Sequence, residues 1–272
     1  MSETTTIEAK EKSTDWLSTV IPIAVAILAV IGWEFIVWAR SIPHYIIPAP
    51  TRIAQTLWAQ WPDLSKATLF TLKITFWSLA IAIVLSVLLA IAFALSRWVE
   101  MSLFPFAVVL QVTPIVAIAP LILIYAPSTT VALLICSTIV AFFPLLSNTV
   151  IGLRSADHNL TDLFTLYRAS TWQRLRYLLI PTALPYFMAG LKIAGGLSLI
   201  GAVVAEFTAG AAGRETGLAS RILEASFRTE IPRMFAALVL VSLCGVAIFL
   251  LFNWLSRIAL GSWHESELKR DR

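Results

Sequence analysis

The chain has 272 residues, of which 58% are apolar and 13% are charged, and its formal net charge is +4. The charged share is about half that of a soluble globular domain. These values exclude a disordered chain and argue against a soluble enzyme, because one core of this size cannot hide so much apolar surface.

Apolar runs long enough to cross a bilayer recur along the chain, since a spanning helix needs about 20 apolar residues. In chain order they occupy residues 17–39, 68–95, 104–126, 130–153, 183–207 and 234–258. A segment in lipid must satisfy its own backbone hydrogen bonds, which favours helices. The sequence therefore predicts an all-α polytopic membrane protein with six transmembrane helices.

The tails and their charges predict how the chain is oriented. Residues 1–16 mix acidic residues with Lys10 and Lys12, unlike a signal peptide, and are expected to be a disordered cytosolic tail before a retained helix at 17–39. Residues 259–272 are expected to be a second cytosolic tail. Counted with the N-terminus inside, eleven Lys and Arg residues fall in inner segments and seven in outer ones, which favours both termini in the cytosol.

Polar residues inside the third and fifth spans are candidates for a translocation path. Pro114 and Pro120 predict kinks in the third span, and Gln111 and Thr113 beside Pro114 are expected to line a water-filled path. Lys192 in the fifth span either lines this path or extends its ammonium group to the interface. Glu206, near the outer end, either acts as a gate, contacts a partner protein or faces headgroup water.

The fifth span also carries a stripe of small residues, each four positions apart. Small residues let helices approach closely in lipid. The stripe therefore packs either within the subunit or along an axis between two copies. It consists of Gly190, Ala194, Ser198 and Ala202.

The inner segment of residues 154–182 contains an amphipathic helix. Its predicted face follows the helical spacing of Leu160, Leu163, Phe164, Tyr167 and Thr171. From composition alone, such a helix either lies on the membrane surface or docks into a groove of a partner protein. Both interpretations remain open on this pattern.

This inner segment resembles the signature of the membrane permease subunits of type I ABC importers, which depend on a binding protein. The signature's acidic residue falls on Asp162, its paired alanines on Leu163 and Phe164, its glycine on Arg168 and its closing Leu-Pro on Ile180-Pro181. The blocks PAPTRI, QVTPIVAIAPL and VVAEF are similar to the branch that carries sulfonates, taurine, nitrate and thiamine precursors. The resemblance covers roughly residues 48–258.

The resemblance implies the type I ABC importer transmembrane fold over residues 64–258, in the bacterial cytoplasmic membrane. It also implies partners: a second permease copy, expected to form a homodimer, separate cytosolic ATP-binding subunits and a periplasmic or lipid-anchored substrate-binding protein. The chain contains no G-x-x-x-x-G-K-[ST] phosphate loop, so ATP is expected on the partner and no cofactor on this chain. Nucleic acid is not an expected partner.

The same resemblance implies which residues couple the permease to its ATPase. These are Asp162, Leu163, Phe164, Tyr167, Arg168, Ala169 and Ser170. The chain departs from the family where Arg168 replaces a turn glycine. Either the turn closes differently, or Arg168 pays a strain of about 1 kcal/mol.

Two alternatives to a permease are an intramembrane enzyme and a secondary transporter. An intramembrane enzyme needs a polar constellation inside the spans, but His44, His158 and His264 all lie outside them, so the chain is not expected to be an enzyme. A secondary transporter favours midplane acidic residues and an internal repeat, and the sequence has neither. The transported solute stays open among sulfonates, nitrate, riboflavin and thiamine-type pyrimidines. Among these solutes, the general similarity of residues 198–207 and 263–266 to the family favours a heteroaromatic vitamin precursor.

Overall fold

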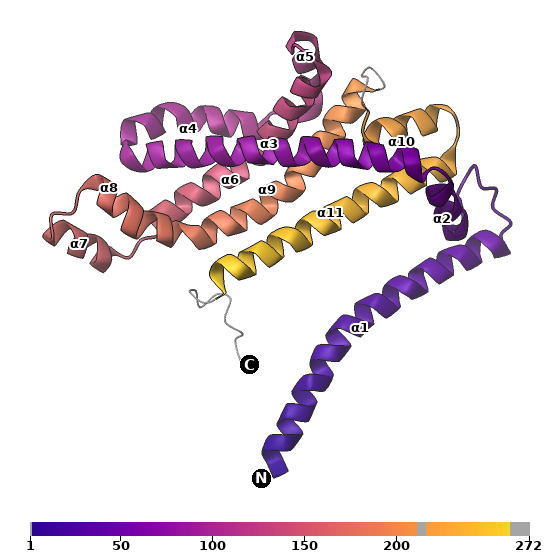
Figure 1. Cartoon of the computed structure of the whole chain (residues 1–272), viewed down its shortest axis with the longest axis horizontal. Helices are drawn as coiled ribbons and strands as arrows, with labels where there is room; N and C mark the ends of the chain where they lie inside the picture. The colour runs from indigo at the N-terminus through magenta and orange to yellow at the C-terminus, as the bar shows by residue number, and fades with distance from the viewer. Residues whose placement is uncertain (1, 211–215, 262–272) are drawn as a thin grey trace. The chain divides into compact units, whose positions relative to one another are not determined.

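The structure of the chain is a computed structural model that describes residues 2–210 and 216–261, with side chains from residue 20 onward. Every regular element in these ranges is a helix (Figure 1). The chain divides into two compact units, one of residues 1–61 with 225–236 and one of residues 62–224 with 237–272. Residues 263–266 lie outside the described part, as does most of the tail at 259–272.

The first unit contains α1 (Ser2–Ala39) and α2 (Pro50–Ala59). The expectation of a disordered tail over residues 1–16 is wrong from Ser2 onward, because α1 includes these residues. Ala, Glu and Lys in this stretch are strong helix formers, and the apolar helix that follows supplies a nucleus from which the helix extends without a new nucleation cost.

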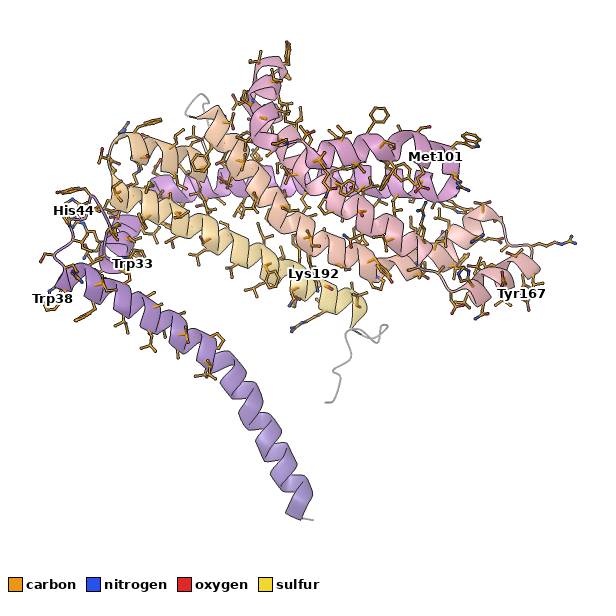
Figure 2. The ribbon with its side chains drawn as sticks, turned by 180° about the vertical axis from the view of Figure 1, so that it is seen from behind. Trp33, Trp38, His44, Met101, Tyr167 and Lys192 are labelled. Carbon is orange, nitrogen blue, oxygen red and sulfur yellow. The ribbon has the colours of Figure 1, made fainter. Side chains whose placement is uncertain are left out.

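Glu34 ties the two helices of this unit together. Its carboxyl group accepts hydrogen bonds from the Thr51 amide at 3.0 Å and the Thr51 hydroxyl at 2.8 Å, at the first turn of α2. Trp33, one residue earlier, packs against Phe235 with ring centroids 6.0 Å apart. Figure 2 shows Trp33, Trp38 and His44 gathered near the end of α1.

The second unit is built on long apolar helices. Its elements are α3 (Trp61–Leu95) from residue 62 onward, α4 (Arg97–Val112), α5 (Ile115–Tyr125), α6 (Thr129–Arg154), α7 (His158–Leu166), α8 (Thr171–Arg174), the π-helix η1 (Leu175–Leu179), α9 (Ile180–Ala209), and the parts of α10 (Leu218–Phe227) and α11 (Ile231–Leu260) outside residues 225–236, which belong to the first unit. In Figure 1, α7 and α8 lie at one end of this bundle and the start of α10 at the other.

The described residues include five helices long and apolar enough to cross a membrane, or six if one bent pair forms a single span. The expected third span at 104–126 is this bent pair, α4 and α5, whose axes differ by 103°. The break falls at Pro114, which lacks an amide hydrogen and forces Thr113 into an extended conformation. The kink predicted at Pro114 is therefore confirmed.

The helix of the fifth span begins earlier than the sequence indicates. A continuous helical segment, with Arg174 and Arg176 near its start, runs over Thr171–Ala209, because α8, η1 and α9 follow one another without a break. The connection expected over residues 154–182 is therefore shorter than predicted. Only residues 155–170, which contain α7, lie between α6 and this segment.

The small-residue stripe of α9 packs within the subunit. All four of its residues are buried, and α9 makes its most extensive contact with α6. A Cβ built on Gly190 would lie 2.8 Å from the Cβ of Asn148 on α6, so the two helices touch there at backbone distance.

Three serines join the spans at the centre of the bundle. The Ser78 hydroxyl on α3 lies 2.6 Å from that of Ser137 on α6 and 2.9 Å from that of Ser198 on α9. Ser137 also donates to the Ser198 carbonyl at 2.7 Å. Buried hydrogen bonds between helices stabilise a bundle in lipid, where no water competes for them.

Candidate functional site

The predicted amphipathic helix of the inner segment is two helices, not one. Asp157 begins α7 by accepting a hydrogen bond from the Asn159 amide at 2.7 Å. Ser170 begins α8 in a capping box, donating its amide to the Gln173 side chain at 2.8 Å. The inner segment therefore contains two short helices, because Ser170 starts a new one.

Arg168 closes the turn between these helices in the conformation that glycine usually adopts. Its φ is 51°, in the left-handed region. The Arg168 amide donates to the Thr165 carbonyl at 3.0 Å and the Ala169 amide to the Phe164 carbonyl at 2.9 Å, which is the Schellman pattern. Of the two expectations for Arg168, the glycine-like turn holds, with a strain of about 1 kcal/mol.

A shallow apolar groove lies between α7 and the start of the fifth span. Its volume is about 370 Å³. Its lining consists of Leu163, Phe164, Tyr167, Ala169, Gln173 and Tyr177. Tyr167 is 81% exposed and lies at the end of the bundle (Figure 2). An exposed aromatic side chain beside an apolar groove is typical of a surface that a partner protein covers.

The predicted coupling residues form two groups by their position relative to the groove. Leu163, Phe164, Tyr167 and Ala169 line the groove. Asp162, Arg168 and Ser170 are exposed outside it, and the Ser170 side chain serves as the cap of α8. Gln173 and Tyr177 also line the groove but are not among the predicted coupling residues. Their spacing of four residues is the sequence signal that places them on one helical face.

The predicted path residues Gln111 and Thr113 line one recess at the break between α4 and α5. The recess has a volume of about 310 Å³, and Pro144 of α6 and Leu197 of α9 form part of its opposite wall. Lys192 is half-buried on α9 and does not line this recess. The structure thus brings two of the four predicted path residues together.

Glu206 lies inside the subunit and does not face headgroup water. Its side chain is 1% exposed. One carboxyl oxygen accepts from the Thr71 hydroxyl of α3 at 2.8 Å, and the other accepts from the Ala219 amide of α10 at 3.0 Å. The Leu218 amide in turn donates to the Thr71 hydroxyl at 2.9 Å.

The first amides of a helix have no partners inside the helix. Glu206 and Thr71 cap α10 by accepting hydrogen bonds from two of these amides. We call this arrangement the α10 latch. Gly217 makes it possible, because a Cβ there would lie 2.1 Å from a carboxyl oxygen of Glu206. No local sequence pattern reveals the latch, since Thr71 and Glu206 are 135 residues apart.

Comparison with known proteins gives both a family and a fold. The model of the family described as binding-protein-dependent transport system inner membrane component matches residues 82–259. The chain is 31% identical to the riboflavin transport system permease protein RibX of Chloroflexus aurantiacus, over 93% of this chain and 92% of the relative. It is 30% identical to the formylaminopyrimidine transport permease protein ThiX of Halalkalibacterium halodurans, over 89% of this chain and 94% of that relative.

A solved structure has a similar fold. It is an inward-facing form of the MetNI methionine ABC transporter, with a TM-score of 0.54 and 18% sequence identity. The match covers 75% of this chain and 97% of that chain. At this identity the match supports the helical fold alone.

Proposed function

The chain belongs to the family of inner membrane components of binding-protein-dependent transport systems, and on that premise we propose that α7 and the turn at Arg168 couple it to a separate ATPase. The chain is the permease subunit of an ABC importer, and its family works with ATPase and substrate-binding partners. The proposal concerns which of its elements contact the ATPase.

The groove beside α7 is the observation that carries this proposal. It presents the apolar side chains of Leu163 and Phe164 together with the ring of Tyr167 at the end of the bundle. The Schellman turn and the Ser170 cap fix α7 relative to the start of the fifth span. A push on α7 would therefore reach α9 through a short, hydrogen-bonded connection.

The proposal also covers the rest of the assembly. The α7 end of the bundle faces the cytosol, both termini lie on that side, and a second copy of the chain completes the pathway in the bacterial cytoplasmic membrane. Gln111 and Thr113 line the path at the α4–α5 break, with Lys192 further along α9. The subunit itself carries out no covalent chemistry, and ATP is bound by its partner.

Tyr167→Asp tests the docking surface. We expect it to weaken binding of the ATPase by roughly 30-fold or more, because an apolar contact of about 2 kcal/mol is lost and a charge is brought into an apolar groove. The measurement is the affinity of the detergent-purified permease for its ATPase.

Leu166→Asp is the matched control for this experiment. Leu166 is 80% exposed, nearly as much as Tyr167, but does not line the groove. The same apolar-to-acidic change there is expected to alter the affinity by less than about threefold. Equal losses in the two variants, or no loss in Tyr167→Asp, would refute docking in this groove.

For the transported solute we propose a heteroaromatic vitamin or vitamin precursor. The support comes from the names of two relatives at 31% and 30% identity, a riboflavin transport permease and a formylaminopyrimidine transport permease. We expect cells that express the complete importer to take up labelled riboflavin or an aminopyrimidine, and not taurine or nitrate. Uptake of taurine alone would contradict this substrate class.

A further inference from the structure

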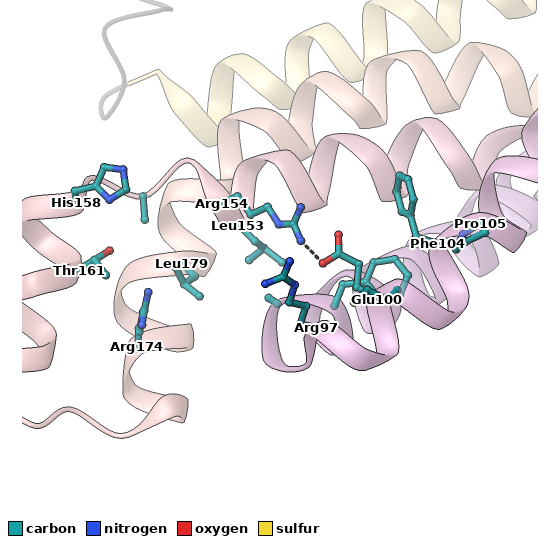
Figure 3. A pocket seen from close by; sticks show the side chains of 14 residues that line it. Arg97, Glu100, Phe104, Pro105, Leu153, Arg154, His158, Thr161, Arg174 and Leu179 are labelled. Carbon is teal, nitrogen blue, oxygen red and sulfur yellow. Dashed lines mark hydrogen bonds and ion pairs between the residues drawn. The ribbon is translucent and has the colours of Figure 1, made fainter.

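A second cavity lies at the α7 end of the bundle, separate from the docking groove. Its volume is about 810 Å³, which falls within the usual range of small-molecule sites, about 300–1,000 Å³. Its walls come from the junction of α3 and α4, the end of α6, and α7 and α8. We call it the basic cavity, after Arg97, Arg154 and Arg174 (Figure 3).

The charge in the basic cavity is unbalanced. Three guanidinium groups face it, together with His158, and the one carboxylate in its lining is Glu100. Glu100 is paired with Arg154, as the dashed line in Figure 3 shows. Within the described part of the chain, Arg97 and Arg174 form no ion pair, so the cavity keeps an excess of positive charge.

The guanidinium groups also keep unused hydrogen-bond donors. A guanidinium carries five N–H donors, and the pair with Glu100 uses one donor nitrogen of Arg154. The Nε atom of Arg174 is buried and has no hydrogen-bond partner among the described residues. Buried donors without partners cost free energy, so a ligand with several acceptor oxygens would stabilise this arrangement.

Apolar side chains also line the basic cavity. They include Phe93, Met101, Phe104 and Leu153. Next to Arg97 in the sequence, the indole of Trp98 is 79% exposed, and Met101 is 60% exposed. Tryptophan at the end of a span is typical of the level of the lipid headgroups. The cavity therefore combines positive charge with apolar surface, as a site for a phospholipid headgroup and the start of its acyl chains requires.

We propose that the basic cavity binds a phosphate ester, and that its source is an anionic phospholipid. The phosphate would lie between Arg97, Arg154 and Arg174, with its glycerol and acyl chains along Phe104 and Met101. Basic pockets between spans on the cytosolic side suit such headgroups, because that leaflet is rich in anionic lipid. The inference rests on the proposed function in one respect, since it takes the α7 end to be cytosolic.

This site would couple lipid to the transport machinery. It joins the end of α6 to both α7 and α8. A bound phosphate would bridge the arginines of α4, α6 and α8. It would thereby hold α7 in the position from which the ATPase is engaged.

The test uses the permease–ATPase complex in nanodiscs of phosphatidylcholine, with and without phosphatidylglycerol. Native mass spectrometry counts the phosphatidylglycerol that stays bound after delipidation. We expect Arg97→Gln with Arg174→Gln to reduce this retention at least about tenfold, because each arginine near the headgroups contributes to lipid attraction. Arg154 is left intact so that its pair with Glu100 still supports the fold.

The matched control removes the same number of charges elsewhere. Arg52 and Arg176 are exposed and do not line the basic cavity, so Arg52→Gln with Arg176→Gln is expected to retain phosphatidylglycerol as the wild type does. Equal retention in all three proteins would overturn the site. Displacement of the lipid by millimolar glycerol phosphate would overturn the lipid as its source.

The outcome separates this inference from the proposed function. Lipid retention is also measured on the permease without ATPase, so it reports on the basic cavity even where the Tyr167 experiment fails. The affinity for the ATPase is measured on the same variants. Loss of lipid retention in Arg97→Gln with Arg174→Gln at unchanged ATPase affinity would overturn the coupling of the basic cavity to α7, while Tyr167→Asp would still decide the docking groove.

Discussion

Glu206→Ala is expected to lower the free energy of unfolding by about 3 kcal/mol, because it removes the acceptor of two hydrogen bonds and leaves buried donors behind. The carboxyl group of Glu206 joins Thr71 of α3 to the first turn of α10 at 2.8 and 3.0 Å. Without it, the Ala219 amide has no partner at the buried end of the helix. The measurement is the thermal midpoint of the purified permease, which should fall by several degrees.

Two further variants separate the latch from a general loss of a carboxylate. Glu230→Ala removes a half-exposed partner of Arg233, an ion pair of 3.0 Å, and should cost about 0–1 kcal/mol. Gly217→Ala leaves Glu206 in place but puts a Cβ within 2.1 Å of its carboxyl oxygen. We expect Gly217→Ala to destabilise the protein as Glu206→Ala does. Wild-type stability of both Glu206→Ala and Gly217→Ala would contradict the latch.

Gly201→Ala is the second change with a large expected effect. A Cβ at Gly201 on α9 would lie 2.9 Å from the Cα of Ser137 on α6. Since backbone cannot move as a flexible side chain does, the two helices must separate, and the hydrogen bond from Ser137 to the Ser198 carbonyl would lengthen. We expect a loss of about 1–3 kcal/mol, as in other overpacked cores.

Gly196→Ala is the control in the same helix. Nothing lies within 4 Å of a Cβ at Gly196, so the added methyl meets no neighbour. Alanine is the better helix former by about 1 kcal/mol, and Gly196→Ala is expected to be neutral or stabilising. Thermal midpoints of the two variants, measured in one detergent, should therefore move in opposite directions. A common direction would show that contact between α6 and α9 does not decide the result.

The break in the third span shows how far local chemistry carries a prediction. Pro114 predicts a kink, because proline lacks an amide hydrogen and restricts the backbone conformation of the residue before it. The 103° angle between α4 and α5 depends on how Ile115 and Ile122 pack against a cluster with Cys136 and Ala202. Those contacts join residues far apart in the sequence, so no local rule predicts the angle.

The inner segment shows the same division. The apolar spacing of Leu163, Phe164 and Tyr167 predicts a helix with one apolar face, and α7 with its groove confirms that face. The end of the helix was placed too late, because Arg168 at a positive φ and the capping box at Ser170 compete with the helical pattern. Periodicity reports which side chains share a face, but a cap depends on single hydrogen bonds.

The sequence by itself determined that this protein is a bundle of membrane helices, roughly where each span lies, and which inner segment resembles the coupling region of an importer. These properties follow from apolar length and from the need of each segment to satisfy its own backbone in lipid, both of which are local. Only the tertiary structure decided the partners of Glu206, the contact of Gly201 with α6 and the convergence of Arg97, Arg154 and Arg174 on one cavity. Each of these joins residues that no helical period relates, because helix packing brings them together.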